Sequence, residues 1–168
     1  MINGVHHVSL ATADMGRCLH FYRDLLGLVL LGEGHTQPGN TSFETVVGLQ
    51  GAQVHGAALR AGNVQIEIFQ YKHPLPGEAA VPRPCDVGIR HICFDVTDIQ
   101  GEYERLKSAG VEFISEPQTM GNHKVKAVYA RDPDNNIVEL QEVFPGSQVD
   151  KSHVRALGAR GIGDDCFR

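Results

Sequence analysis

HVSLATADMGRCLHFYRDLLGL (residues 7–28) and HICFDVTDIQGEYERLKSAGV (residues 91–111) are two versions of one pattern. Each stretch opens with a histidine at the start of a short run with strand character, and an aspartate follows seven positions later. Asp14 and Asp98 are predicted to be helix N-caps, because a carboxylate at that position accepts hydrogen bonds from the free amides of the first turn. The chain therefore contains one strand–helix unit twice.

The remainder of each half adds further strands to this unit. Both predicted helices end on glycine, Gly27 and Gly110, which adopts the left-handed conformation of a helix C-terminus at little cost. The strand candidates that follow are residues 28–31, 45–49, 53–60 and 64–70 in the first half, and 111–115, 124–130 and 136–142 in the second. Each half is predicted to be a βαβββ module, and the fold class is α+β.

The repeat also sets the expected domain organisation. One domain is predicted over residues 1–144, with module one at 4–71, a linker at 72–88 and module two at 89–144. The linker holds four of the eight prolines, a residue that marks connections rather than helices or strands. Neither module alone could bury a sufficient core, so the two are expected to form one domain. The glycine-rich residues 145–168 are predicted to be a C-terminal extension.

Composition excludes several classes of protein. The 168 residues are 42% hydrophobic and 21% charged, which is typical of a globular chain. No apolar run approaches the ~18 residues of a membrane span, and the N-terminus lacks a signal-peptide pattern. A formal net charge of −5 argues against a nucleic-acid surface. The four cysteines show neither CxxC spacing nor the density of a disulfide scaffold. These features predict a cytoplasmic protein with no membrane or nucleic-acid partner.

Strand alternation places one ligand-type residue on the polar face of four predicted strands. A glutamate among aliphatic residues is costly unless it is paired or coordinated, and the two final strands each contain one. If the modules pair about a pseudo-twofold axis, the four polar faces line one concave cup. Two imidazoles and two carboxylates are suited to one divalent ion, and zinc, nickel, cobalt, manganese and iron are all compatible. The predicted metal ligands are His7, Glu67, His91 and Glu139.

At these residues the chain resembles the vicinal oxygen chelate superfamily, which includes glyoxalase I, methylmalonyl-CoA epimerase, extradiol dioxygenases and bleomycin resistance proteins. The resemblance runs from Gly4 to Val143, and VQIEIFQY (residues 64–71) and YARDPDNNIVELQE (residues 129–142) carry it together with the two stretches above. It implies that the two modules form an incomplete barrel around a metal ion, with ligands from the first and last strand of each module. Those positions are the four residues already reached from alternation.

The resemblance also implies an activity. The ligand order His, Glu, His, Glu is similar to that of bacterial glyoxalase I, a metal-dependent lyase or isomerase that abstracts a proton next to a metal-bound carbonyl through an enediolate. Glu139 is the first candidate for the base and Glu67 the second. The expected substrate is a small carbonyl compound, such as a glutathione hemithioacetal or a CoA thioester. The expected assembly is a homodimer, with the metal site within one chain or shared between two.

Three alternatives remain open from the sequence. The epimerases that resemble this chain have glutamine where Glu67 stands. An extradiol dioxygenase would use three ligands, His7, His91 and Glu139, and would leave Glu67 unexplained; Tyr129 stands near the place of that group's tyrosine. A metal-free binding protein of the resistance type would typically lack the ligand residues.

Overall fold

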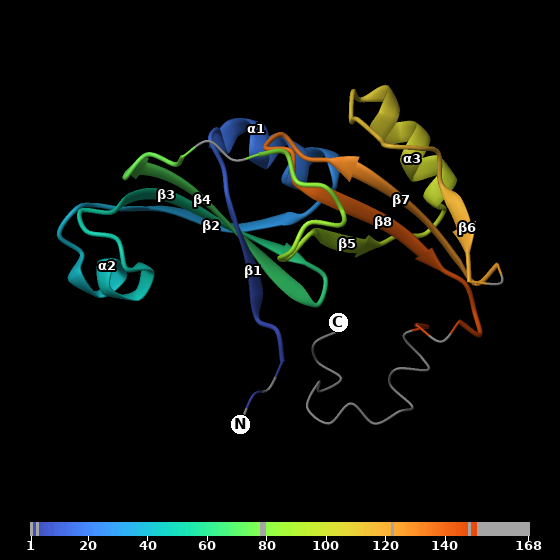
Figure 1. The fold of residues 1–168 in the computed structure, drawn as a ribbon, viewed down its shortest axis with the longest axis horizontal. Coiled ribbons are helices and arrows are strands. Elements are labelled where there is room, and N and C mark those ends of the chain that lie inside the picture. The colour runs from blue at the N-terminus through green and yellow to red at the C-terminus, as the bar shows by residue number, and fades with distance from the viewer. Residues whose placement is uncertain (1, 3, 78–79, 122, 148, 151–168) are drawn as a thin grey trace. The chain divides into compact units, whose positions relative to one another are not determined.

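The computed structural model describes residues 2, 4–77, 80–121, 123–147 and 149–150. These residues form two compact units, divided between residues 79 and 80, and each unit contains an open four-stranded sheet (Figure 1). The predicted α+β class is confirmed. None of the helices in the described residues is long and apolar enough to cross a membrane. The predicted C-terminal extension lies outside the described residues from residue 151 onward.

The first unit contains four strands and three helical segments. In chain order they are β1 (His7–Ala11), α1 (Met15–Leu19), the π-helix η1 (His20–Leu25), β2 (Val29–Thr36), α2 (Thr41–Val47), β3 (Gln53–Ala61) and β4 (Val64–His73). The strand order is β1-β4-β3-β2. β1 runs parallel to β4, and the other neighbours are antiparallel.

The second unit repeats this topology with fewer helices. Its elements are β5 (His91–Asp95), α3 (Ile99–Ser108), β6 (Gln118–Met120), β7 (Val125–Arg131) and β8 (Ile137–Val143). The strand order β5-β8-β7-β6 corresponds to that of the first sheet. Again only one pair is parallel, that of β5 and β8, the first and last strands of the unit in chain order. The tandem repeat predicted from the sequence is therefore confirmed.

The predicted helix caps are present in both units. Oδ1 of Asp14 accepts a hydrogen bond from the Arg17 amide at 3.1 Å, and Oδ1 of Asp98 accepts one from the Gly101 amide at 3.2 Å. At the other end, Gly27 has φ of 75°, the left-handed conformation that glycine permits. The sequence signals for helix start and stop were thus correct in both halves.

A second contact at each helix start comes from the last strand of the same unit. Nε2 of Gln70 in β4 donates to the Ala13 carbonyl at 2.6 Å. At the equivalent place in β8, the two oxygens of Glu142 accept from the amides of Asp98 and Ile99, each at 3.1 Å. A carboxylate at a helix N-terminus satisfies free amides and complements the helix dipole. These contacts tie each helix to the strand that carries a predicted ligand glutamate.

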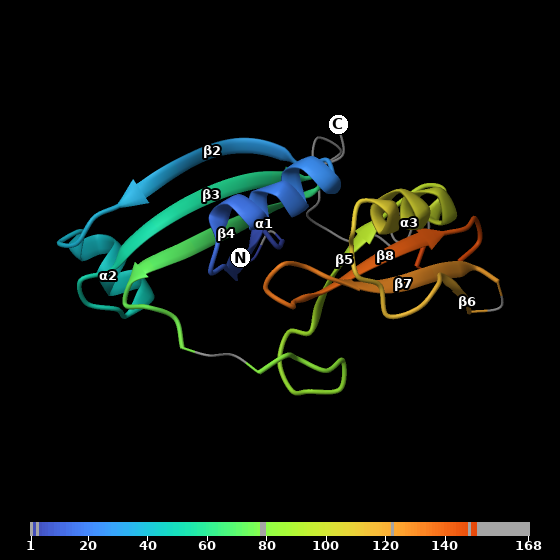
Figure 2. The same ribbon diagram turned by 90° about the horizontal axis from the view of Figure 1, so that it is seen from above.

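The core of each unit lies between its helix and one face of its sheet. α1 packs on β4 and α3 packs on β8 (Figure 2). Ile66 and Ile68 of β4 are completely buried on this helix-covered face, and Val138 and Leu140 of β8 are nearly so. Because alternate side chains of a strand point to opposite faces, the glutamates between these residues point away from the helix. We call this other face of each sheet its ligand face.

Two predicted strands are wrong. Residues 45–49 lie in and just after α2 rather than in a strand. Oδ1 of Asn40 caps the start of this helix by accepting from the Phe43 amide at 3.1 Å, and Gly48 ends it with φ of 68°. These two caps outweigh the β propensity of the threonine and valines between them.

Residues 111–115 also form no strand. The Val111 amide donates to the Leu106 carbonyl at 3.0 Å, so the segment begins as part of the end of α3. Its only bridge to the sheet pairs Phe113 with Ala130, within the described residues. The short edge strand β6, at residues 118–120, takes the place of the predicted one.

Candidate metal centre and active site

Each unit brings one predicted histidine next to one predicted glutamate. In the first unit, Nε2 of His7 lies 3.4 Å from Oε2 of Glu67. In the second, Nε2 of His91 lies 3.0 Å from Oε2 of Glu139. The prediction that these residue types share a face is therefore correct within each unit.

The two pairs have the same register in their sheets. His7 on β1 stands opposite Gln65 on the parallel strand β4, and the glutamate is two residues further along β4. His91 on β5 stands opposite Ile137 on β8, and Glu139 is again two residues further along. Because a step of two returns to the same face of a strand, each glutamate faces the same side as its histidine.

The structure shows the predicted ligands as two separate pairs rather than as one set of four. Among the described residues, no group of three or more histidine, cysteine, aspartate or glutamate side chains is arranged to hold a metal ion. One pair belongs to each unit. The four-ligand set thus remains a prediction, and the geometry that supports it is that of each pair taken by itself.

The chemistry of each pair fits a divalent transition metal. Imidazole nitrogen and carboxylate oxygen are both ligands of zinc, nickel, cobalt, manganese and iron. In both pairs Nε2 of the histidine faces Oε2 of the glutamate. Within each pair, the nitrogen and the oxygen that could bind a metal therefore lie on the same side of their sheet. All four side chains keep some exposure, from 10% for Glu139 to 42% for His7, and solvent therefore reaches both pairs.

Glu139 is the more enclosed of the two glutamates. Its strand partners are Cys93 on β5 and Tyr129 on β7, and the Tyr129 ring lies 5.3 Å from the His91 ring. Burial, and then the charge of Glu139, raise the pKa of the Tyr129 hydroxyl. Although Cys93 as a residue is exposed, burial of its thiol and then the adjacent carboxylate raise its pKa to about 12. Both groups are protonated at neutral pH.

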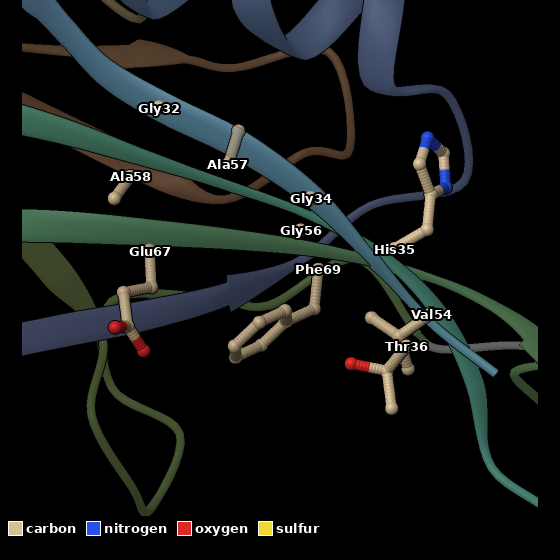
Figure 3. A pocket seen from close by; sticks show the side chains of 10 residues that line it. All are labelled: Gly32, Gly34, His35, Thr36, Val54, Gly56, Ala57, Ala58, Glu67 and Phe69. Carbon is tan, nitrogen blue, oxygen red and sulfur yellow. The ribbon is translucent and has the colours of Figure 1, made fainter. Parts of the chain in front are cut away.

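Glu67 has smaller neighbours and more open space. Its strand partners are Ser9 on β1 and Ala58 on β3. Beside it the ligand face of the first sheet is hollowed, with a volume of about 330 Å³. Figure 3 shows Glu67 and Phe69 on the same face of β4, at the edge of this hollow. The hollow exists because its floor carries almost no side chains: the floor residues are Gly32, Gly34, Gly56 and Ala58.

Sequence reasoning missed this hollow and the neighbours of Glu139. The signal for the hollow was present, because glycines alternate in GEG (residues 32–34) and small residues fill GAA (residues 56–58). The sequence places Tyr129 in a predicted strand just before an Asp-Pro turn, and Asp132 does hold that turn by accepting from the Asn136 amide at 2.8 Å. The pairing that puts Tyr129 next to Glu139 depends on the β7–β8 register, which no local motif specifies.

Comparison with known proteins identifies the family. The model of the Glyoxalase/Bleomycin resistance protein/Dioxygenase superfamily matches residues 4–140. The chain belongs to this superfamily, which confirms the resemblance to the vicinal oxygen chelate group.

Relatives within the superfamily differ in activity. The chain is 28% identical over 151 residues to an ethylmalonyl-CoA/methylmalonyl-CoA epimerase from Cereibacter sphaeroides, covering 85% of this chain and 100% of that protein. It is 23% identical over 144 residues to the metallothiol transferase FosB from Shouchella clausii, covering 83% and 80%. The crystal structure of a glyoxalase family protein from Bacillus cereus is similar in fold, with a TM-score of 0.77, 22% identity, and coverage of 86% of this chain and 96% of that one.

Proposed function

We propose that this protein is a metal-dependent lyase or isomerase of the glyoxalase I type, which moves a proton at a carbon next to a carbonyl. One observation carries the proposal: an imidazole–carboxylate pair occupies the same register position in both sheets, on the face opposite the core. A carboxylate among the aliphatic residues of a strand costs free energy unless it is paired or coordinated, and its presence at the same position in both repeats supports a use for both.

The four residues His7, Glu67, His91 and Glu139 would hold one divalent ion. They come from two modules, of one chain or of two chains in a homodimer. When bound, the ion would supply Lewis acidity toward the substrate's carbonyl oxygen and so acidify the neighbouring C–H bond.

Glu139 is the proposed base. Its side chain is 10% exposed, against 30% for Glu67, so less water competes with the substrate for its oxygens. The protonated thiol of Cys93 lies on one side of it and the protonated hydroxyl of Tyr129 on the strand at its other side. Both groups carry a proton that can be donated to a carboxylate oxygen. Glu67 is the candidate to return a proton from the other pair.

The hollow beside Glu67 is the proposed place for the rest of the substrate. A floor of glycines lets a ligand lie directly on the backbone of β2 and β3, and Phe69 provides an apolar wall. A hollow of about 330 Å³ is at the small end of ligand sites, so it holds part of a larger substrate. Glutathione hemithioacetals and CoA thioesters are both compatible with this arrangement.

A second candidate, an acyl-CoA epimerase, is favoured by one observation. The Cereibacter relative, named for that activity, matches along its whole length. Proton removal by one glutamate and return by the other would invert a stereocentre. The departure at Glu67, where similar epimerases have glutamine, weighs against this candidate.

The test combines metal analysis with deuterium exchange. Untagged protein is expected to contain one divalent ion per chain by mass spectrometry. In D₂O it should incorporate deuterium at the α-carbon of one member of a panel containing the methylglyoxal–glutathione hemithioacetal and methylmalonyl-CoA. Glu139→Gln should abolish incorporation, whereas Glu104→Gln, at an exposed position in α3, should not change it. A metal-free wild type, or exchange that survives Glu139→Gln, would refute the proposal.

A further inference from the structure

The residue before the first predicted ligand also contacts it. Nδ1 of His6 lies 2.9 Å from Nδ1 of His7, and the two rings are nearly perpendicular, at 87°. The other ring nitrogen of His7, Nε2, faces Glu67 at 3.4 Å. Both nitrogens of the His7 ring therefore have a partner, one on each side.

This contact constrains where the His7 ring carries its proton. A neutral imidazole has one N–H and one lone pair, so a hydrogen bond between two Nδ1 atoms requires one of them to donate and the other to accept. Metal ligation through Nε2 requires a lone pair there, which leaves the proton of His7 on Nδ1. Nδ1 of His6 then has to accept the hydrogen bond that the Nδ1–H of His7 donates.

We infer that His6 is a positioning residue for the metal centre: its Nδ1 accepts the Nδ1–H of His7 and so holds His7 in the tautomer and ring orientation that present Nε2 to the ion. Metal-bound histidines generally donate their second N–H to an acceptor, which fixes the ring and raises its basicity. This inference rests on the proposed metal-dependent function.

His6 is itself held in place by the sheet. Its carbonyl oxygen accepts a hydrogen bond from the Gln65 amide at 3.2 Å, which ties this residue to β4 immediately before β1 begins. A backbone anchored in this way lowers the entropy that the His6 ring loses when it contacts His7.

The second module lacks this device. The residue before His91 is Arg90, and a guanidinium has donors but no acceptor. Arg90 cannot accept the N–H of a neighbouring imidazole. The two modules thus have equivalent ligand pairs but different residues beside the histidine, and only the first pair depends on the residue that precedes it.

The test is a set of zinc titrations of the full chain by calorimetry. His6→Phe keeps a ring and removes the acceptor, whereas His6→Asn keeps an acceptor, Oδ1, at the same distance along the side chain as Nδ1. His6→Phe should bind zinc about tenfold more weakly, the lower end of the effect of removing such a partner. His6→Asn should bind with nearly the wild-type Kd. His20→Phe is the matched control, because His20 pairs with Asp24 rather than with a ligand.

A spectroscopic measurement separates positioning from folding. In ¹⁵N-labelled, zinc-loaded protein, Nδ1 of His7 should carry the proton and show a coupling across the hydrogen bond to Nδ1 of His6. The melting temperature of metal-free His6→Phe should match that of the wild type. Equal zinc affinity of wild type and His6→Phe, or a His7 ring protonated at Nε2 in the loaded protein, would overturn this inference alone. A wild type that binds no divalent ion would overturn the proposed function and this inference together.

Discussion

Nε2 of His91 lies 3.0 Å from Oε2 of Glu139, and the carboxylate in this pair is the more buried of the two ligand-type glutamates. The equivalent distance in the first module is 3.4 Å, with a carboxylate that is 30% exposed. The repeat therefore produces two histidine–glutamate pairs with the same register and different exposure to solvent.

This difference predicts unequal costs of losing each histidine in metal-free protein. His91→Ala leaves the Glu139 carboxylate buried without its imidazole, which should lower the free energy of unfolding by about 1–3 kcal/mol. His7→Ala exposes a carboxylate that water already reaches, and the expected loss is about 0–1 kcal/mol. Urea denaturation in the presence of a chelator measures both. Equal losses would contradict the assignment of Glu139 as the enclosed carboxylate.

Glu67 distinguishes the proposed proton transfer from ring cleavage. Glu67→Ala should reduce metal content and abolish deuterium exchange, because the proposed site uses four ligands. A three-ligand dioxygenase would keep its metal in this variant. Metal analysis and an oxygen electrode with catechol as substrate check the result. Retention of metal together with oxygen consumption would favour the dioxygenase alternative.

The helix caps should affect stability and not metal content. Asp14→Ala should cost ~1 kcal/mol, the typical value for an N-cap. Asp98→Ala should cost at least as much, because Asp98 has φ of 57°, where alanine is strained. Asp98→Asn is the matched control, since asparagine both caps and tolerates this conformation. Thermal melts measure the loss of stability, and metal analysis of the folded variants measures the metal content. A fall in metal content would show that Asp14 or Asp98 has a role at the metal site and is not only a helix cap.

The Cys93 thiol should be slow to react in metal-free protein. Its pKa is raised to about 12, by burial first and by Glu139 second, so little thiolate exists at pH 8. The folded state holds the Cys93 proton more tightly than the unfolded chain does. The contribution of this thiol to the free energy of unfolding is therefore complete below about pH 8.5, and it declines as the pH rises toward 12. Glu139→Gln should speed alkylation by iodoacetamide at Cys93. An unchanged rate would show that Glu139 does not influence the thiol.

Filling the hollow should weaken substrate binding without unfolding the protein. A Cβ at Gly34 would meet no atom within 4 Å, so Gly34→Leu is expected to fold and to keep its metal. A Cβ at Gly56 would lie 3.1 Å from the Phe69 ring, so Gly56→Leu, unlike Gly34→Leu, should also lower the stability of the fold. In Gly34→Leu, KM should rise at least about tenfold, equivalent to ~1.4 kcal/mol of binding free energy. A KM equal to that of the wild type would show that the hollow does not hold substrate.

The sequence by itself determined the repeat, the helix caps and the strand face on which each predicted ligand lies. These depend on local patterns: an aspartate seven residues after a histidine, a glycine after a helix, and a glutamate among alternating aliphatics. Such signals act over a few residues, so a single sequence contains them in full. Alternation placed Glu67 opposite the aliphatic side chains of its strand, and the parallel β1–β4 pairing in the structure then brought His7 to the same face, 3.4 Å away.

Only the tertiary structure decided the surroundings of each pair. The β7–β8 register put Tyr129 beside Glu139, and the β2–β3–β4 register put the glycine floor beside Glu67. Residues 45–49 became helical because Asn40 and Gly48 cap that turn, against the preference of the residues between them. The caps of α2 are local signals worth about 1 kcal/mol each, and they outweigh the β propensity of the residues between them. Strand register depends instead on packing between distant parts of the chain, so no one segment encodes it.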